Sequence, residues 1–87
     1  MDTVTKRLQN ERKFARWEPT SDGGRRYWFE VSGKAGWFAR YVKEVDAQEN
    51  TTRFYQEIYD DKGKLVEIHL KFPEDKGHQV ITESDQT

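Results

Sequence analysis

The residue with the clearest chemical potential is His69, which lies in a stretch of alternating apolar and charged side chains. Pairing residues 52–59 with residues 65–72 in an antiparallel hairpin would place this imidazole near Glu57 and Arg53. Such a group can cleave a phosphodiester bond. The carboxylate accepts the 2′-hydroxyl proton, the histidine protonates the leaving oxygen, and the arginine stabilises the charged phosphorane. A small ribonuclease using Glu57, Arg53 and His69 is therefore one hypothesis for this chain.

Composition weighs against catalysis. Charged residues make up 36% of the chain, so a glutamate, a histidine and an arginine share a strand face by chance alone. The two histidines, His69 and His78, are far apart in the sequence, and the chain has no cysteine. A tetrahedral metal site needs histidine or cysteine ligands at short, regular spacing, and that pattern is missing. We therefore expect no enzyme activity, no catalytic residue, no metal and no cofactor.

A second group of side chains suits binding better than catalysis. Aromatic rings and arginines recur together along the predicted strands. Such rings stack on bases in nucleic-acid-binding proteins, and together with arginine they anchor the hot spots of protein interfaces. The candidate binding residues are Trp28, Tyr55, Tyr59, Arg26, Arg40, Arg53 and His69.

Charge balance discriminates between these two kinds of partner. The chain has 15 basic and 16 acidic side chains, for a formal net charge of -1. The predicted binding face also carries carboxylates that offset its cations, namely Glu30, Glu44, Glu57 and Glu67. A phosphate backbone requires an excess of positive charge, whereas mixed charge orients a protein partner. The sequence therefore favours a small protein-interaction module, acting as an adaptor, inhibitor or homodimerising domain. RNA or single-stranded nucleic acid is the alternative ligand.

The candidate binding residues lie on segments that the sequence predicts to be β-strands. Aromatic and β-branched residues recur in short runs between turn-forming clusters, as in an antiparallel meander. The predicted strands cover residues 12–17, 25–32, 37–45, 52–59 and 65–72. Residues 37–48 also fit one face of a helix, but Gly33, Gly36 and the abundance of aromatics and valine favour a strand. The predicted fold class is mainly β, a small antiparallel meander of about five strands.

Turn composition predicts how the first of two hairpins pairs. The residues between the strands at 25–32 and 37–45 include a three-residue loop, residues 34–36, that ends in glycine. That loop would set Phe29 opposite Tyr41 on one face of the sheet.

The second hairpin decides which way the last strand faces. A three-residue loop at residues 61–63, a type I turn closed by glycine, would set Ile58 opposite Val66. A shorter loop would set Ile58 opposite Glu67 and expose the apolar side chains, so the hydrophobic pattern favours the longer loop. This register places His69 across from Tyr55.

The predicted register divides the sheet into two faces. The predicted core consists of Tyr27, Phe29, Val31, Ala39, Tyr41, Val45, Phe54, Ile58, Val66, Ile68, Leu70 and Phe72. The candidate binding residues lie on the opposite face. Because a flat sheet would leave the core open to water, we expect the sheet to curl into a small barrel or the N-terminal segment to cover it.

The chain divides into three parts. Residues 1–11 form a partly ordered N-terminal segment, a short helix or turn whose apolar anchors are Val4 and Leu8. Residues 12–72 form the β-meander domain, and residues 73–87 form a flexible tail. The absence of cysteine fits a reducing compartment, and no apolar run resembles a signal peptide or a membrane span. We therefore expect a cytoplasmic protein that does not contact membranes.

Overall fold

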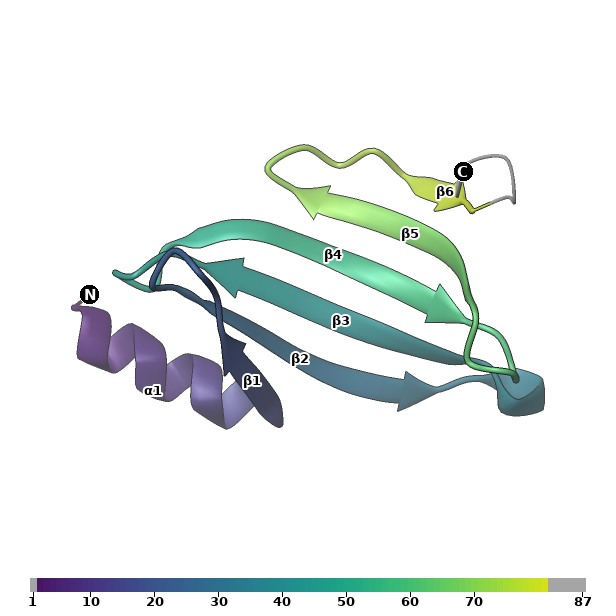
Figure 1. The fold of residues 1–87 in the computed structure, drawn as a ribbon, viewed down its shortest axis with the longest axis horizontal. Coiled ribbons are helices and arrows are strands. Elements are labelled where there is room, and N and C mark those ends of the chain that lie inside the picture. The colour runs from purple at the N-terminus through teal and green to yellow at the C-terminus, as the bar shows by residue number, and fades with distance from the viewer. Residues whose placement is uncertain (1, 82–87) are drawn as a thin grey trace.

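A computed structural model describes residues 2–81 and contains one antiparallel sheet of six strands in the order β1-β2-β3-β4-β5-β6 (Figure 1). A single helix, α1 (Thr3–Lys13), precedes the sheet. The strands are β1 (Arg16–Pro19), β2 (Arg25–Ser32), β3 (Phe38–Val45), β4 (Thr51–Tyr59), β5 (Leu65–Phe72) and β6 (His78–Val80), with a 3-10 turn η1 (Lys34–Gly36) between β2 and β3. The mainly β meander is confirmed. Its edges, β1 and β6, are not paired with each other, so the sheet is open and the barrel alternative is wrong.

The N-terminal part differs from the predicted strand at residues 12–17. Helix α1 extends through Lys13, and the first strand starts only at Arg16. The helix begins at the N-cap Asp2, whose carboxylate accepts a hydrogen bond from the Thr5 amide at 2.7 Å. The predicted anchors Val4 and Leu8 are 66% and 56% exposed, so other side chains hold the helix on the sheet.

The C-terminal part contains a strand that the sequence did not indicate. Within the segment 73–87, the structure places β6 beside β5, with His69 opposite His78 and Glu67 opposite Val80. Residues 82–87 of the expected flexible tail lie outside the described residues. No helix among residues 2–81 is long and apolar enough to cross a membrane.

The hairpin of β2 and β3 has the predicted register. Phe29 lies opposite Tyr41, and their rings stack with centroids 5.1 Å apart. The turn requires positive φ angles at Ala35 (56°) and Gly36 (82°), a conformation that glycine adopts without strain. The strand interpretation of residues 37–45 is therefore confirmed for β3.

The hairpin of β4 and β5 has the predicted loop but not the predicted register. Gly63 has a φ of 79°, and the Asp60 carboxylate accepts hydrogen bonds from the amides of Lys62 and Lys64 at 2.9 Å. After the first pair, however, the register shifts, and Ile58 lies opposite Glu67. Val66 is thus the extra residue of a β-bulge, which turns the following side chains of β5, through Leu70, to the other face. A second register shift, at Lys71, returns Phe72 to the face of Phe54.

Because of the bulge, the predicted assignment of β5 side chains to the two faces is wrong for residues 68–70. Ile68 lies opposite Glu57 and Leu70 opposite Tyr55, so these two predicted core residues share the face that was expected to bind a partner. His69 instead lies opposite Gln56, on the face that α1 covers. We call the face covered at one end by α1 the helix face and the opposite one the groove face.

The core is smaller than predicted and lies on both faces. On the helix face, Phe14, Tyr27 and Val45 are buried, and Phe29 and Phe54 pack against them. On the groove face, Val42 and Tyr55 are buried. The other predicted core residues are less covered, and Val31 and Phe72 are 48% and 44% exposed. Val31 lies near the C-terminal end of β2, which points away from α1 (Figure 1).

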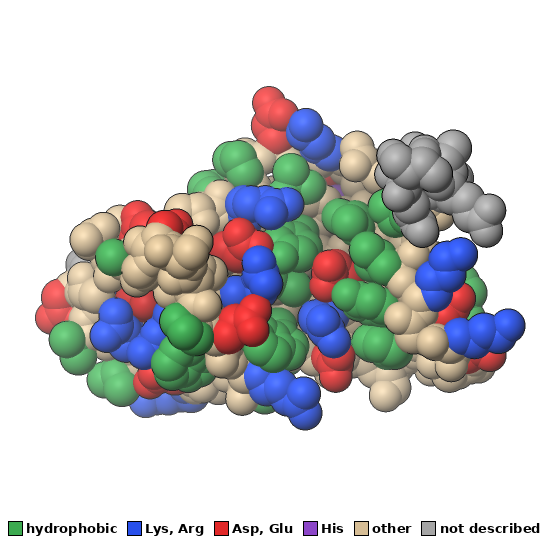
Figure 2. Space-filling view, viewed as in Figure 1, with side chains coloured by type: hydrophobic (Ala, Val, Ile, Leu, Met, Phe, Trp, Pro, Cys, Tyr) green, Lys and Arg blue, Asp and Glu red, His purple; other side chains and the backbone are tan. Residues whose placement is uncertain are grey.

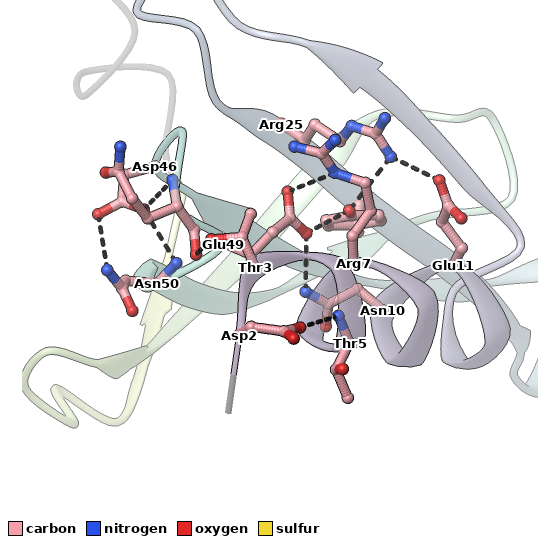
Figure 3. A network of polar contacts seen from close by, with 12 residues as sticks. Asp2, Thr3, Thr5, Arg7, Asn10, Glu11, Arg25, Asp46, Glu49 and Asn50 are labelled. Carbon is pink, nitrogen blue, oxygen red and sulfur yellow. Dashed lines mark hydrogen bonds and ion pairs between the residues drawn. The ribbon is translucent and has the colours of Figure 1, made fainter.

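A buried carboxylate joins α1 to the sheet (Figure 3). Glu49, in the loop between β3 and β4, accepts hydrogen bonds from the Tyr27 hydroxyl at 2.5 Å and from the Asn10 amide at 3.2 Å. Arg7 of α1 lies 3.5 Å from its other oxygen, and the Glu49 side chain is 1% exposed. Because Glu49, Tyr27 and Asn10 are buried and partnered, the helix is fixed by polar contacts as well as by Phe14.

Candidate functional site

A groove of about 220 Å³ lies on the groove face, over strands β1 to β4. It is lined by Glu18, Arg26, Trp28, Arg40, Val42, Tyr55, Glu57 and Tyr59. The lining contains two arginines and two glutamates, so its formal charge balances.

The register of the strands arranges this face in alternating rows. Side chains directly opposite each other on neighbouring strands point the same way, and residues two apart on a strand share a face. One charged row is Glu18, Arg26, Glu44 and Arg53, and the next charged row is Glu30, Arg40 and Glu57. Between them lies the apolar row Trp28, Val42, Tyr55 and Leu70, and beyond the second charged row lie Phe38 and Tyr59.

Each arginine of these rows is paired within the sheet. Arg26 contacts Glu18 at 2.9 Å and Glu44 at 3.4 Å. Arg40 contacts Glu30 at 2.8 Å, and Arg53 lies 3.7 Å from Glu44. The charges therefore cancel in place, and the ion pairs restrict the orientations of these side chains.

The tyrosines of the groove are fixed by carboxylates. The Tyr55 hydroxyl donates to Glu44 at 2.8 Å, and the Tyr59 hydroxyl donates to Glu57 at 3.0 Å. Burial raises the pKa of Tyr55 and of Tyr59, and the adjoining carboxylates raise both pKa values further. Both phenols therefore stay neutral at physiological pH and keep their rings in one orientation.

Cations and aromatic neighbours complete the packing of these rings. The Phe38 ring stacks on Tyr59 with centroids 4.8 Å apart. The guanidinium carbons of Arg40 and Arg53 lie 5.2 Å and 4.7 Å from the ring centroids of Tyr59 and Tyr55. The groove is thus rigid, amphipathic and lined by preorganised side chains.

The structure brings together most of the predicted binding residues. Five of them line the groove, namely Trp28, Tyr55, Tyr59, Arg26 and Arg40. Arg53 lies in the adjoining charged row. His69 does not belong to the site, because the bulge at Val66 places it on the helix face. There, His69 contacts Asp75 at 2.6 Å.

The grouping proposed for a ribonuclease is not assembled. Glu57 and Arg53 lie on the groove face, whereas His69 is on the helix face. The His69 ring instead lies 4.4 Å from the ring of His78, which contacts Glu67 at 2.8 Å. Among residues 2–81, no group of three or more histidine, cysteine or acidic side chains is arranged to hold a metal ion.

Three lining residues were not in the predicted binding set: Glu18, Val42 and Glu57. Val42 and Glu57 could have been added from the sequence, because both fall on the predicted binding face beside Trp28 and Tyr59. Glu18 could not, since it lies outside the predicted strands at residues 12–17 and 25–32, whereas the first strand extends from Arg16 to Pro19.

No family model, curated protein or solved structure matches this chain. The fold and the groove define a small antiparallel sheet protein that has a helix on one face and an open, aromatic, charge-balanced groove on the other.

Proposed function

We propose that the chain is a protein-interaction module whose groove face binds another protein. The observation that carries this proposal is the groove itself, in which Trp28, Tyr55 and Tyr59 lie between two rows of paired charges. Aromatic rings and arginines are the side chains most often found at interface hot spots, and rows of mixed charge orient a partner. We place this activity in the cytoplasm, in line with the absence of cysteine.

The pairing of the arginines supports a protein partner over nucleic acid. Phosphate binding gains its free energy from cations that are available to replace counterions. Arg26 and Arg40 already contact carboxylates at 3.4 Å or less, so a phosphate would compete with those contacts and meet the glutamates beside them. A protein surface with an apolar ridge and polar edges matches the groove without breaking these pairs.

The same geometry supports binding and not catalysis as the role of this face. Its titratable groups are neutral phenols and carboxylates that already serve as hydrogen-bond acceptors for tyrosine or arginine. A general acid or base must be free to exchange a proton with a substrate. We therefore propose no reaction for the groove.

The experiment that tests the proposal is affinity capture with three forms of the protein: wild type, Trp28→Ala and Trp17→Ala. Trp17 is the matched control, because it is 43% exposed and lies opposite Tyr27 on the helix face. A protein captured by wild type and by Trp17→Ala but lost with Trp28→Ala supports the proposal. Circular dichroism establishes that both variants are folded.

Nuclease and salt separate the alternatives. A protein partner of the groove should survive nuclease treatment and bind with weak dependence on salt, because the charges that it meets are already paired. Capture of RNA alone, or equal capture by all three forms, would contradict the proposal. If the captured partner is the chain itself, sedimentation of the purified protein should show a dimer that Trp28→Ala dissociates.

A further inference from the structure

A second hollow, of about 290 Å³, lies on the helix face where the end of α1 meets strands β3, β4 and β5. Its apolar wall consists of three phenylalanine side chains, Phe14, Phe54 and Phe72. Phe14 is 2% exposed and forms the floor, whereas Phe72 is 44% exposed and stands open to solvent. A large exposed ring beside a buried one leaves apolar surface that a ligand can cover.

Two lysines, Lys13 and Lys43, flank this apolar wall. Within residues 2–81, neither ammonium lies within ion-pair distance of a carboxylate, since the ion pairs found there use arginine or histidine. Lys43 donates instead to the neutral Asn10 amide oxygen at 2.9 Å. Lys13 lies in the last turn of α1, where its charge also offsets the helix carbonyls.

Nearby groups do not neutralise this pair of cations. Glu49 is the carboxylate whose charge acts on Lys43, but its oxygens already accept hydrogen bonds from Tyr27 and Asn10. Burial lowers the pKa of Lys43, and the charge of Lys13 lowers it further, although Glu49 partly offsets this effect. A third ammonium, that of Lys71, lies 6.0 Å from the centroid of the Phe54 ring. The hollow is therefore apolar inside and positive at its rim, unlike the charge-balanced groove.

We propose that this hollow binds a small carboxylate that carries one aromatic ring or a short alkyl chain. The apolar part covers Phe14, Phe54 and Phe72, and the carboxylate accepts hydrogen bonds from Lys13 and Lys43. An anion relieves the repulsion between the two ammonium groups, whereas a cation would increase it. The volume is just below the range of about 300 to 1,000 Å³ that is typical of drug-sized ligands, so a single ring fits and a large cofactor does not.

The test is an NMR titration of the full chain with three probes of equal shape: 3-phenylpropanoate, 3-phenylpropan-1-ol and 3-phenylpropylamine. We expect saturable amide shifts at Phe14, Phe54 and Phe72 with the carboxylate. The neutral alcohol should bind about tenfold more weakly, because it loses the charge-assisted hydrogen bonds. The amine should cause no saturable shift at these positions.

Variants show whether the named residues hold the ligand. Lys43→Gln should weaken binding of the carboxylate about tenfold, while Lys62→Gln, at the tip of the β4–β5 hairpin, should leave it unchanged. If Lys43→Gln loses its fold, Lys13→Gln provides the same test at an exposed side chain. Phe72→Ala should weaken the carboxylate and the alcohol alike. Equal binding of the carboxylate and the alcohol, shifts confined to other residues, or no saturation with 3-phenylpropanoate would overturn the proposal.

Discussion

At the scale of single residues, Glu49 joins the β3–β4 loop, α1 and β2 through one buried carboxylate. It has a φ of 64°, and its carboxylate is buried where Tyr27 and Asn10 both donate to it. Hydrogen bonds within the loop stabilise this conformation, since the Asp46 carboxylate accepts hydrogen bonds from the amides of Gln48 and Asn50 at 2.9 Å. The side chain therefore meets its partners without having to order the loop first.

We expect Glu49→Ala to lower the free energy of unfolding by about 3 kcal/mol, because it leaves a buried hydroxyl and a buried amide without an acceptor. Urea unfolding followed by fluorescence measures the change. Glu11→Ala is the control, since it also removes a carboxylate that contacts an arginine, but at an exposed site. Its expected cost is below about 1 kcal/mol. Equal losses for the two variants would mean that the Glu49 contacts do not hold the helix.

Tyr27 makes the fold sensitive to alkaline pH. Burial raises the pKa of Tyr27 to about 12, and the hydrogen bond to Glu49 adds to this increase. The unfolded chain releases the phenol proton near pH 10, so stability from this group is complete below that pH and is lost as pH rises through the folded value. The loss between these two pH values should be roughly 2 to 3 kcal/mol.

The measurement is the free energy of unfolding as a function of pH, for wild type and Tyr27→Phe. The variant starts from a lower stability at neutral pH, because Glu49 loses its closest donor, but its decline above pH 10 should be shallower. Identical slopes for the two proteins would show that the Tyr27 phenol does not control the alkaline response.

At the scale of elements, the bulge at Val66 determines what each face carries. Because the chain has no cysteine, disulfide trapping can test the register directly. Residues directly opposite on antiparallel strands have Cα atoms roughly 4.5 to 5.5 Å apart, within the range of a disulfide. We therefore expect Gln56→Cys combined with His69→Cys to oxidise readily. Gln56→Cys combined with Ile68→Cys, the pair that a regular hairpin would bring together, should stay reduced.

The outcome of this test separates the two registers, because adjacent residues on β5 point to opposite faces. Mass spectrometry after mild oxidation counts the free thiols, and size-exclusion chromatography removes intermolecular dimers. Oxidation of the Ile68→Cys pair instead would restore the register expected from the sequence and return His69 to the groove face.

The sequence predicts the β2–β3 hairpin well and the β4–β5 hairpin only in part. For the first hairpin, Gly36 marks the turn and the apolar residues agree with one register only. For β5, Val66, Ile68 and Leu70 lie on one face whether or not the strand contains a bulge. The pattern therefore shows that the strand is amphipathic but contains no information on which face of the sheet receives its apolar side.

The hydrophobic pattern of the sequence also could not predict where the helix packs on the sheet. The apolar residues Val4 and Leu8 point to solvent, and the helix is held by Asn10 and by Phe14 at its C-cap. Asn10 and Glu49 are 39 positions apart in the sequence, and a polar contact between such residues leaves no periodic signal. Most groove residues could be predicted, because β2 and β3 were placed correctly and the faces follow from alternation.

At the scale of the whole molecule, the open sheet depends on short strands at both edges. Strand β1 has 4 residues and ends in Pro19, which has no amide hydrogen to donate. Strand β6 has 3 residues and covers part of β5, which has 8. Long unpaired edges invite pairing with another chain, whereas short edges limit it.

We therefore expect a chain that ends at Gly77, and so lacks β6, to associate as its concentration rises, because β5 becomes the edge. Analytical ultracentrifugation across a range of concentrations measures this. The control is a chain that ends at Ile81, which keeps β6 and lacks only the residues beyond it. Association of both shortened chains to the same extent, or of neither, would show that β6 does not protect the edge.

The alternating rows of the groove face also restrict how a partner can be placed on it. In Figure 2, acidic and basic side chains alternate over the middle of the molecule with hydrophobic ones between them, and the strand register orders the side chains of the groove face by row. Rows lie about 7 Å apart along the strands, and neighbouring strands about 4.8 Å apart. A partner displaced by one row would set its apolar groups against charges. A partner displaced by one strand along the row of Glu18, Arg26, Glu44 and Arg53 would meet the opposite sign at each position. The face therefore disfavours misalignment of a partner both along and across the strands. The selectivity of the proposed binding would come from the positions of the charges more than from their total.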